Sequence, residues 1–343
     1  DLVRSRGLGD VYKRQELQGA FKGMENAGNP WQVRESRMKW AEGLDVPTVE
    51  DTDEYEILYW VGCAGSFEPR AQKIARSLVG VLRAAGVKFA VLGQEESCTG
   101  DPARRAGNEF LFQLQAMQNI AVLNGYAEKR IVTACPHCFN TLKNEYPVLG
   151  GVYEVMHHTQ FINTLFKEGK LKVKGGSFQG KRITFHDPCY LGRGNGEYEA
   201  PREVLAKLDI ELVEMKRSRA KGLCCGAGGA QMFKEAEPGN KEVNVERSEE
   251  ALGMQPSVIA AGCPFCNTML TDGVKHFNKE GEVQVKDIAE LIAEAAARRG
   301  SSVRTRSGQP ANAGCLARRA AASGSGLSSA NFTIAASSSS TCG

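Results

Sequence analysis

The sequence predicts an α/β protein built from two tandem, duplicated domains, each a mainly parallel sheet flanked by helices. Nine of the 11 cysteines lie between Cys63 and Cys266, and four landmarks of the first half recur after 126, 126, 128 and 128 residues. The surrounding sequences ACPHCFNTL and GCPFCNTML also match. Because near-constant spacing is the signature of an internal repeat, duplication of one domain is the simplest explanation.

Strand and helix patterns alternate in the same order in both halves. Residues 55–62 (YEILYWVG) are rich in aromatic and β-branched residues and predict a strand. A helix over 69–85, a strand over 88–92, a long helix over 106–127, a strand over 130–133 and a helix beginning at CPHC follow. The second half repeats this order through RITFHDP, PREVLAKL, IELVEM, SVIAAG and CNTMLTDGVKHF. Such alternation indicates βαβ units and a parallel sheet.

The cysteines stand where this architecture places ligand sites. Cys63, Cys135, Cys189 and Cys263 each follow a predicted strand directly. Ligands of open α/β sheets bind beyond the carboxyl ends of the strands, so we expect the cysteines to gather there. A CxxC motif at the start of a helix also puts its sulfurs near free N–H groups, which favours the ionised, metal-binding thiolate.

Composition excludes several classes of protein. The formal net charge of the 343 residues is +3, but residues 300–343 contribute Arg304, Arg306, Arg318 and Arg319 and no acid, so the remainder is slightly acidic. A nucleic-acid partner therefore has no electrostatic support. We see no apolar stretch long enough to span a bilayer and no secretory signal. Paired CxxC motifs in a long chain without an export signal indicate a reducing, cytoplasmic compartment and metal-bound thiolates.

Both ends look foreign to the repeat. Residues 10–15 (DVYKRQ) resemble a translated sequencing-library adapter, so we interpret 1–15 as an artefact and the chain as a fragment of a longer protein. The Ser/Ala/Gly/Arg run over 300–343 is interpreted as a disordered or frameshifted tail, whose Cys315 and Cys342 bind nothing. Between these ends we expect a helical linker at 16–54, a first cysteine-rich domain at 55–175 and a second at 180–297.

The second cysteine set has five members, Cys189, Cys224, Cys225, Cys263 and Cys266. Neighbouring residues on a regular strand point to opposite faces. Here Gly226 and the glycines after it permit a tight loop, so that both sulfurs of the CC pair can turn toward one site. Five thiolates exceed what one tetrahedral zinc ion uses, whereas an iron–sulfur cluster has several irons to share them.

The first cysteine set has four members, Cys63, Cys98, Cys135 and Cys138, because Thr99 stands where the second set has Cys225. Four thiolates suit an ordinary cubane cluster, and they also suit one structural zinc ion. Both alternatives remain open on the residues alone.

The tandem pattern C…CCG…CxxC, with HDPCYLGR, YEAPR, CCGAGG and CPFC in the second half, resembles the cysteine-rich (CCG) domain of iron–sulfur oxidoreductases. That domain occurs in heterodisulfide reductase B/D-type subunits and in the iron–sulfur subunit of glycolate oxidase. The resemblance implies a 4Fe-4S cluster on the second set, with the non-cubane form as one alternative, and a second cluster on the first set.

The resemblance also implies partners. Similar proteins work with other redox subunits or an electron-transfer flavoprotein, and some carry an upstream ferredoxin-like domain and membrane helices. Residues 21–40 resemble the linker that follows such a ferredoxin-like part. We therefore expect an iron–sulfur electron-transfer subunit that exchanges electrons with a flavoprotein, quinone or disulfide, cytoplasmic or held at the cytoplasmic face of a membrane.

Two other functions stay open. One is a zinc-binding structural module, and the other is a thiol/disulfide enzyme in which Cys224 and Cys225 react directly. In the cluster interpretation these two residues are the catalytic candidates. For His186 and Asp187 a role beside the thiolates and a strand-end cap are both consistent with the sequence, whereas His137 is interpreted as a partly exposed filler.

Overall fold

The computed structural model describes residues 16–128, 130–173, 176–236 and 238–297. The sequence-based interpretations of residues 1–15 and 300–343, including those of Cys315 and Cys342, lie outside this part of the chain. Within it, none of the helices combines the length and the apolar character needed to cross a membrane.

The first half folds into a four-stranded parallel sheet of order β2-β1-β3-β4. Its strands are β1 (Ile57–Trp60), β2 (Phe89–Ala90), β3 (Arg130–Thr133) and β4 (Glu154–His157). Its helices are α2 (Gly62–Phe67), α3 (Pro69–Ala84), α4 (Asp101–Arg105), α5 (Glu109–Asn124), α6 (Pro136–Asn140) and α7 (His158–Lys167). A π turn (Thr141–Glu145) and a 3-10 turn (Tyr146–Leu149) continue from α6.

The second half repeats that topology as a parallel sheet of order β6-β5-β7-β8. Its strands are β5 (Arg182–Phe185), β6 (Glu211–Val213), β7 (Val258–Ala261) and β8 (Gln284–Asp287). Its helices are α8 (Gly192–Asn195), α9 (Glu199–Leu205), α10 (Val243–Gly253), α11 (Pro264–His276) and α12 (Ile288–Ala297). The predicted fold class, two duplicated parallel α/β sheets flanked by helices, is confirmed.

Two elements differ from the prediction. The helix expected over 106–127 is shorter, because Gly107 has a positive φ of 81° and Asn108 caps a new helix by accepting a hydrogen bond from the Leu111 amide at 3.2 Å. Residues 101–105 form the separate α4 before it. Helix α10 had no counterpart in the prediction, since its pattern of apolar residues is weak.

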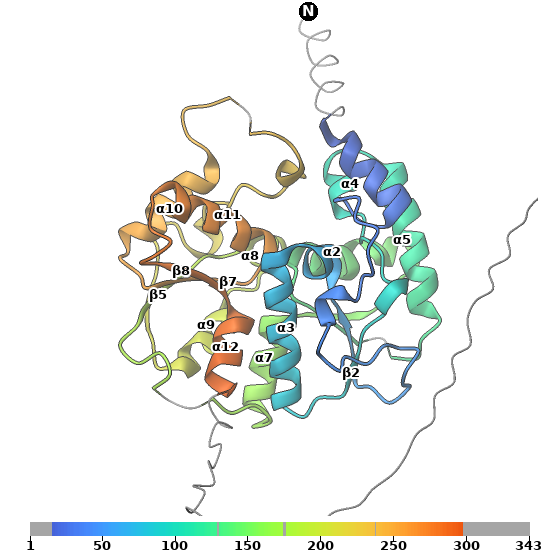
Figure 1. Cartoon of the computed structure of the whole chain (residues 1–343), viewed down its shortest axis with the longest axis horizontal. Coiled ribbons are helices and arrows are strands. Elements are labelled where there is room, and N and C mark those ends of the chain that lie inside the picture. The colour runs from blue at the N-terminus through green and yellow to red at the C-terminus, as the bar shows by residue number, and fades with distance from the viewer. Residues whose placement is uncertain (1–15, 129, 174–175, 237, 298–343) are drawn as a thin grey trace, which may run out of the picture. The chain divides into compact units, whose positions relative to one another are not determined.

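The two sheets share one apolar core. Helix α12 of the second half contacts α3 and α7 of the first, and α9 contacts α7; α3 and α12 run side by side in the centre of Figure 1. Buried residues of both halves, among them Leu78, Ile162, Val204 and Ile288, belong to one cluster. At its rim the Arg70 guanidinium donates two hydrogen bonds, of 2.9 and 2.7 Å, to the Glu290 carboxylate. The core therefore fixes the position of each sheet against the other.

The segment before the first sheet packs closely onto it. Residues 16–27 are helical, and Leu17, Phe21 and Met24 are buried in the core of the first half. Trp40 is buried in the shared core and meets Tyr59 edge-on, with ring centroids 6.2 Å apart. This segment therefore carries residues to the first cysteine set, as described below.

The contact between α10 and α11 depends on Gly273. A methyl group there would lie 2.7 Å from Ser248 Cβ and 3.0 Å from the Asn244 backbone oxygen. We expect Gly273→Ala to lower the free energy of unfolding by about 1–3 kcal/mol, because overpacking forces the two helices apart. Chemical denaturation of the variant and the parent protein, in the same metal state, measures this.

Gly253→Ala is the matched control, because Gly253 ends α10 with open space around it. Alanine there should leave stability unchanged or raise it by about 0.5–1 kcal/mol, since glycine in a helix is entropically unfavourable. Equal effects of the two substitutions would contradict the packing argument.

Candidate metal centres

The first cysteine set converges from three loops at the carboxyl end of the first sheet. Cys63 lies in α2 directly after β1, Cys98 precedes α4, and Cys135 is the N-cap of α6, which contains Cys138. All four side chains are buried and line one cavity, which Trp31 and Phe265 also line. Phe265 belongs to the CPFC motif of the second half, so both halves shape this cavity.

The four thiols of the first set are paired. Cys63 hydrogen bonds with Cys98, and Cys135 with Cys138. Burial raises the pKa of Cys63, but the bonds from Cys98 and a nearby guanidinium lower it overall to about 7. The bond with Cys63, together with burial, holds the pKa of Cys98 well above its usual range. One thiolate per pair is therefore favoured by its surroundings.

That guanidinium belongs to Arg37, in the segment before the first sheet. Its Nη2 donates to Cys63 Sγ at 3.4 Å and to Glu96 Oε1 at 2.7 Å. The Glu96 carboxylate also accepts from the backbone amides of Val61 and Gly62, at 2.9 and 2.8 Å. This buried ion pair clamps the loop that carries Cys63. Sequence reasoning missed both residues, because nothing in their local pattern distinguishes them from surface charges.

The second cysteine set forms a continuous chain of sulfur contacts. Hydrogen bonds link Cys189 to Cys224, Cys224 to Cys225, Cys225 to Cys266, and Cys266 to Cys263. Cys263 is the N-cap of α11 and Cys266 lies in its first turn. Cys189 and Cys224 are half-buried, whereas the other three are buried. All five predicted residues are therefore brought together, and one side of the set faces outward.

The glycine after the CC pair makes this arrangement possible. Gly226 has a φ of 93°, in the left-handed region, and its amide donates to Cys224 Sγ at 3.3 Å. Gly100 donates in the same way to Cys98 in the first set. The contacts with Cys189 and Cys225 lower the pKa of Cys224 strongly. Cys224 is therefore the most acidic thiol of the second set.

His186 is oriented toward the second set by Arg247. Arg247 Nε donates to His186 Nδ1 at 3.0 Å, so the proton of the neutral ring must reside on Nε2. Nε2 is buried and has no hydrogen-bond partner among the described residues. A ring nitrogen of His186 and the sulfurs of Cys225 and Cys266 lie within 4.8 Å of one another. Of the two roles open for His186, the geometry favours the one beside the thiolates.

Asp187 serves a different purpose. Its carboxylate accepts two hydrogen bonds from Arg202, at 2.8 and 3.0 Å, and one from the Arg219 amide at 2.7 Å. These bonds tie the strand end before Cys189 to α9 and to the loop before the CC pair. Asp187 is thus a structural anchor, and Arg202 is buried with it.

The interpretation of His137 as a partly exposed filler is wrong. Its side chain is buried, its Nδ1 lies 2.9 Å from Asp101 Oδ2, and it hydrogen bonds with Cys263 of the second set. That bond contributes to lowering the pKa of Cys263 to about 5, although burial alone would raise it. No local pattern indicates this contact, because it crosses between the two halves.

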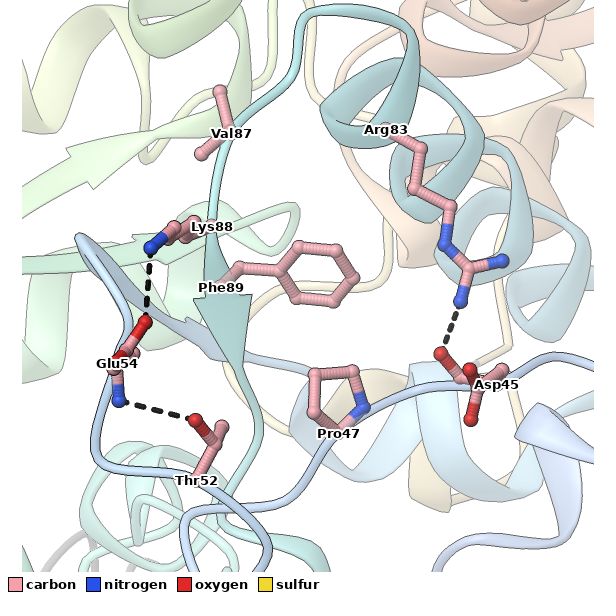
Figure 2. Close-up of a pocket in the computed structure, with 8 residues that line it drawn as sticks. All are labelled: Asp45, Pro47, Thr52, Glu54, Arg83, Val87, Lys88 and Phe89. Carbon is pink, nitrogen blue, oxygen red and sulfur yellow. Dashed lines mark hydrogen bonds and ion pairs between the residues drawn. The ribbon is translucent and has the colours of Figure 1, made fainter.

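A wider pocket of about 670 Å³ lies at the β2 edge of the first sheet, far in sequence from the CxxC motifs. Figure 2 shows Phe89 and Pro47 between two polar pairs. Lys88 Nζ bonds to Glu54 at 3.0 Å, and Arg83 donates to the Asp45 carbonyl. Because these charged groups are satisfied by one another and no cysteine or histidine lines the pocket, it offers no comparable chemistry.

The two sets together present nine thiols, none of which forms a disulfide in the described part of the chain. Thiolates are soft ligands that select zinc, copper(I) or iron–sulfur clusters. Amides and cationic side chains aimed at the sulfurs offset the charge that such thiolates carry. Each set can therefore hold a metal group that accepts several sulfur ligands.

Comparison with known proteins agrees with the repeat. The family model described as "CCG: Cysteine-rich domain" matches residues 57–143 and 183–271. The probable iron-sulfur-binding oxidoreductase FadF of Bacillus subtilis is 46% identical over 303 residues, which cover 86% of this chain and 43% of that protein. The EtfAB:quinone oxidoreductase of Syntrophomonas wolfei is 42% identical, with 81% and 40% covered.

Another relative is matched over most of its length. The D-type polypeptide of the dihydromethanophenazine:CoB–CoM heterodisulfide reductase of Methanosarcina barkeri is 34% identical over 308 residues, which cover 86% of this chain and 70% of that protein. The chain spans less than half the length of the two bacterial relatives. Because the family model matches both halves and places each around one of the two cysteine sets, the chain belongs to the CCG cysteine-rich domain family and carries the domain twice.

Proposed function

We propose that each cysteine set binds an iron–sulfur cluster of the 4Fe-4S type, and that the chain is an electron-transfer subunit of an oxidoreductase. The observation that carries this proposal is the convergence of five thiols, linked by sulfur contacts, with His186 Nε2 buried beside them and unpartnered among the described residues. An inorganic sulfide or cysteine sulfur of a cluster would accept the hydrogen bond that this nitrogen otherwise lacks.

The donor sets fit the proposed groups. Five thiols exceed a tetrahedral zinc site, and they suit either a cubane with one sulfur to spare or a non-cubane cluster. The four thiols of the first set equal the ligand number of a cubane. When bound, such clusters accept and release one electron at a time.

The surroundings assign different tasks to the two sets. The first set is fully buried beneath Trp31, which suits a centre that relays electrons. The second set has Cys189 and Cys224 half-buried, so a partner or substrate can approach it. We therefore propose the second set as the reacting end, with Cys224 and Cys225 as its catalytic candidates.

The names of the relatives guide the proposed partners. One name joins EtfAB with a quinone, and another belongs to a component of a heterodisulfide reductase. For this chain we propose other redox subunits, a flavoprotein and a quinone or disulfide as electron partners. A ferredoxin-like domain and a membrane part upstream in the parent protein would hold it at the cytoplasmic face of a membrane.

A direct thiol/disulfide enzyme is the second candidate function. It is favoured by the low pKa of Cys224, which the contacts with Cys189 and Cys225 produce, and by the partial exposure of this side chain. A thiolate of this kind can attack a disulfide without any metal.

Iron analysis tests the proposal. Protein purified or reconstituted without oxygen should be brown and hold about eight irons, with as much sulfide, as two 4Fe-4S clusters require. Cys98→Ser and Cys263→Ser should each remove about half of the iron, because each set loses a ligand that no neighbour replaces. Colourless protein with stoichiometric zinc would overturn the cluster assignment.

A substitution in the tail provides the matched control. Cys315→Ser changes a thiol that lies in neither set, so its iron and sulfide content should equal that of the parent chain. Loss of iron in this control as well would mean that the effect of the other two variants is not specific to the proposed ligands.

Cys225→Ala separates the two candidate functions. If the second set holds a cluster, the change should alter its EPR and visible spectra, because one sulfur of a five-thiol set is removed. If Cys224 and Cys225 react directly, the variant should keep all its metal and its spectra while losing disulfide-reducing activity. The spectra and a thiol-release assay on the same samples therefore distinguish the candidates.

A further inference from the structure

His137 belongs to the CPHC motif of the first half but contacts the second cysteine set. Its Nδ1 is held by Asp101 Oδ2 at 2.9 Å, which leaves Nε2 as the group that bonds to Cys263. Asp101 is itself fixed by Arg105, whose Nε lies 3.1 Å from Oδ1. The ring is therefore oriented by two neighbours on its own half and aimed at a sulfur of the other half.

Aromatic side chains of the second half hold the ring from the other side. Tyr190, the residue after Cys189, lies with its ring centroid 4.3 Å from that of His137 at a tilt of 31°. Phe265 meets the same ring edge-on, with centroids 5.3 Å apart. The His137 side chain is 8% exposed as a residue, so little water competes for its nitrogens.

The two halves are not equivalent at this position. The spacing of 128 residues that relates Cys135 to Cys263 also relates His137 to Phe265. Phe265 lines the cavity of the first set, just as His137 faces the second, but a phenyl ring has no N–H to donate. A cross-domain hydrogen bond from this position thus reaches only the second set.

We propose that His137 is a positioning residue of the first domain that tunes the redox centre of the second domain by hydrogen bonding to Cys263. This inference rests on the proposed function, because it requires a cluster on the second set. Reduction adds negative charge that the sulfur ligands share, and a donor at one sulfur stabilises the reduced form. His137 therefore raises the reduction potential of the second centre and leaves the first without a matching effect.

The test compares three variants of the full chain, loaded anaerobically, by iron and sulfide analysis and by redox titration followed by EPR. His137→Phe introduces the residue that the second copy carries. His137→Gln keeps an N–H donor without the ring. His276→Phe is the matched control, because His276 is exposed at the end of α11 and lies in neither motif. Repeating the titrations in the Cys98→Ser background isolates the signal of the second centre.

We expect His137→Phe to keep its iron and to shift the reduction equilibrium of the second centre about tenfold toward the oxidised form, which is about 59 mV for one electron. His137→Gln should restore part of this shift, and His276→Phe should match the parent. If the Phe variant does not assemble the second centre, the Gln variant decides, with a smaller shift in the same direction supporting the inference.

Two results would overturn the inference while leaving the proposed function intact. One is full iron content with an unchanged potential in His137→Phe. The other is an equal shift in the Phe and Gln variants, which would show that ring packing rather than the hydrogen bond matters. A parent chain that binds no iron would instead overturn the proposed function itself, and iron analysis reports that before any titration begins.

Discussion

Bringing many thiols into one buried space is the constraint on which the rest of this structure depends. Thiolates that approach one another in a medium of low polarity repel, and each loses its hydration. The protein opposes this cost with donors aimed at sulfur: Arg37 at Cys63, the Gly226 amide at Cys224 and His137 at Cys263. The N-termini of α6 and α11 add free amides at both CxxC motifs. Without these groups, mutual repulsion would keep the thiols protonated or apart.

The shared core determines how the two sets meet. Behind both CxxC loops lies a chain of buried side chains in which His157 bonds to His158 at 3.2 Å and His158 to Asp287 at 2.9 Å. His157 also bonds to the backbones of Ala134 and Gly262, the residues before Cys135 and Cys263. One histidine therefore ties together the two loops that carry the first cysteine of each CxxC motif. Because burial and His158 keep the pKa of His157 well below its usual range, this tie is made by a neutral ring.

Repetition made much of this predictable from the sequence. The spacing of the cysteines indicates the duplication, and the strand patterns indicate two parallel sheets with the cysteines at their carboxyl ends. Residues that act across long separations were not predictable in the same way. Arg37 reaches Cys63 from a segment with no strand or motif, and His137 reaches a sulfur of the other domain. Local pattern reports which face of an element is buried, whereas these contacts depend on how the domains pack.

The departures from exact repetition are where the two copies acquire different properties. Thr99 replaces the fifth thiol in the first copy and lies with its Oγ1 3.9 Å from Cys138 Sγ, so a weak donor stands where the second copy has a sulfur. Arg37 brings a cation to the first set, while the second relies on His186 and His137. Two centres with identical surroundings would have equal potentials, and electrons would have no preferred direction between them. Duplication followed by divergence at a few positions is thus enough to turn two copies of one site into an ordered pair.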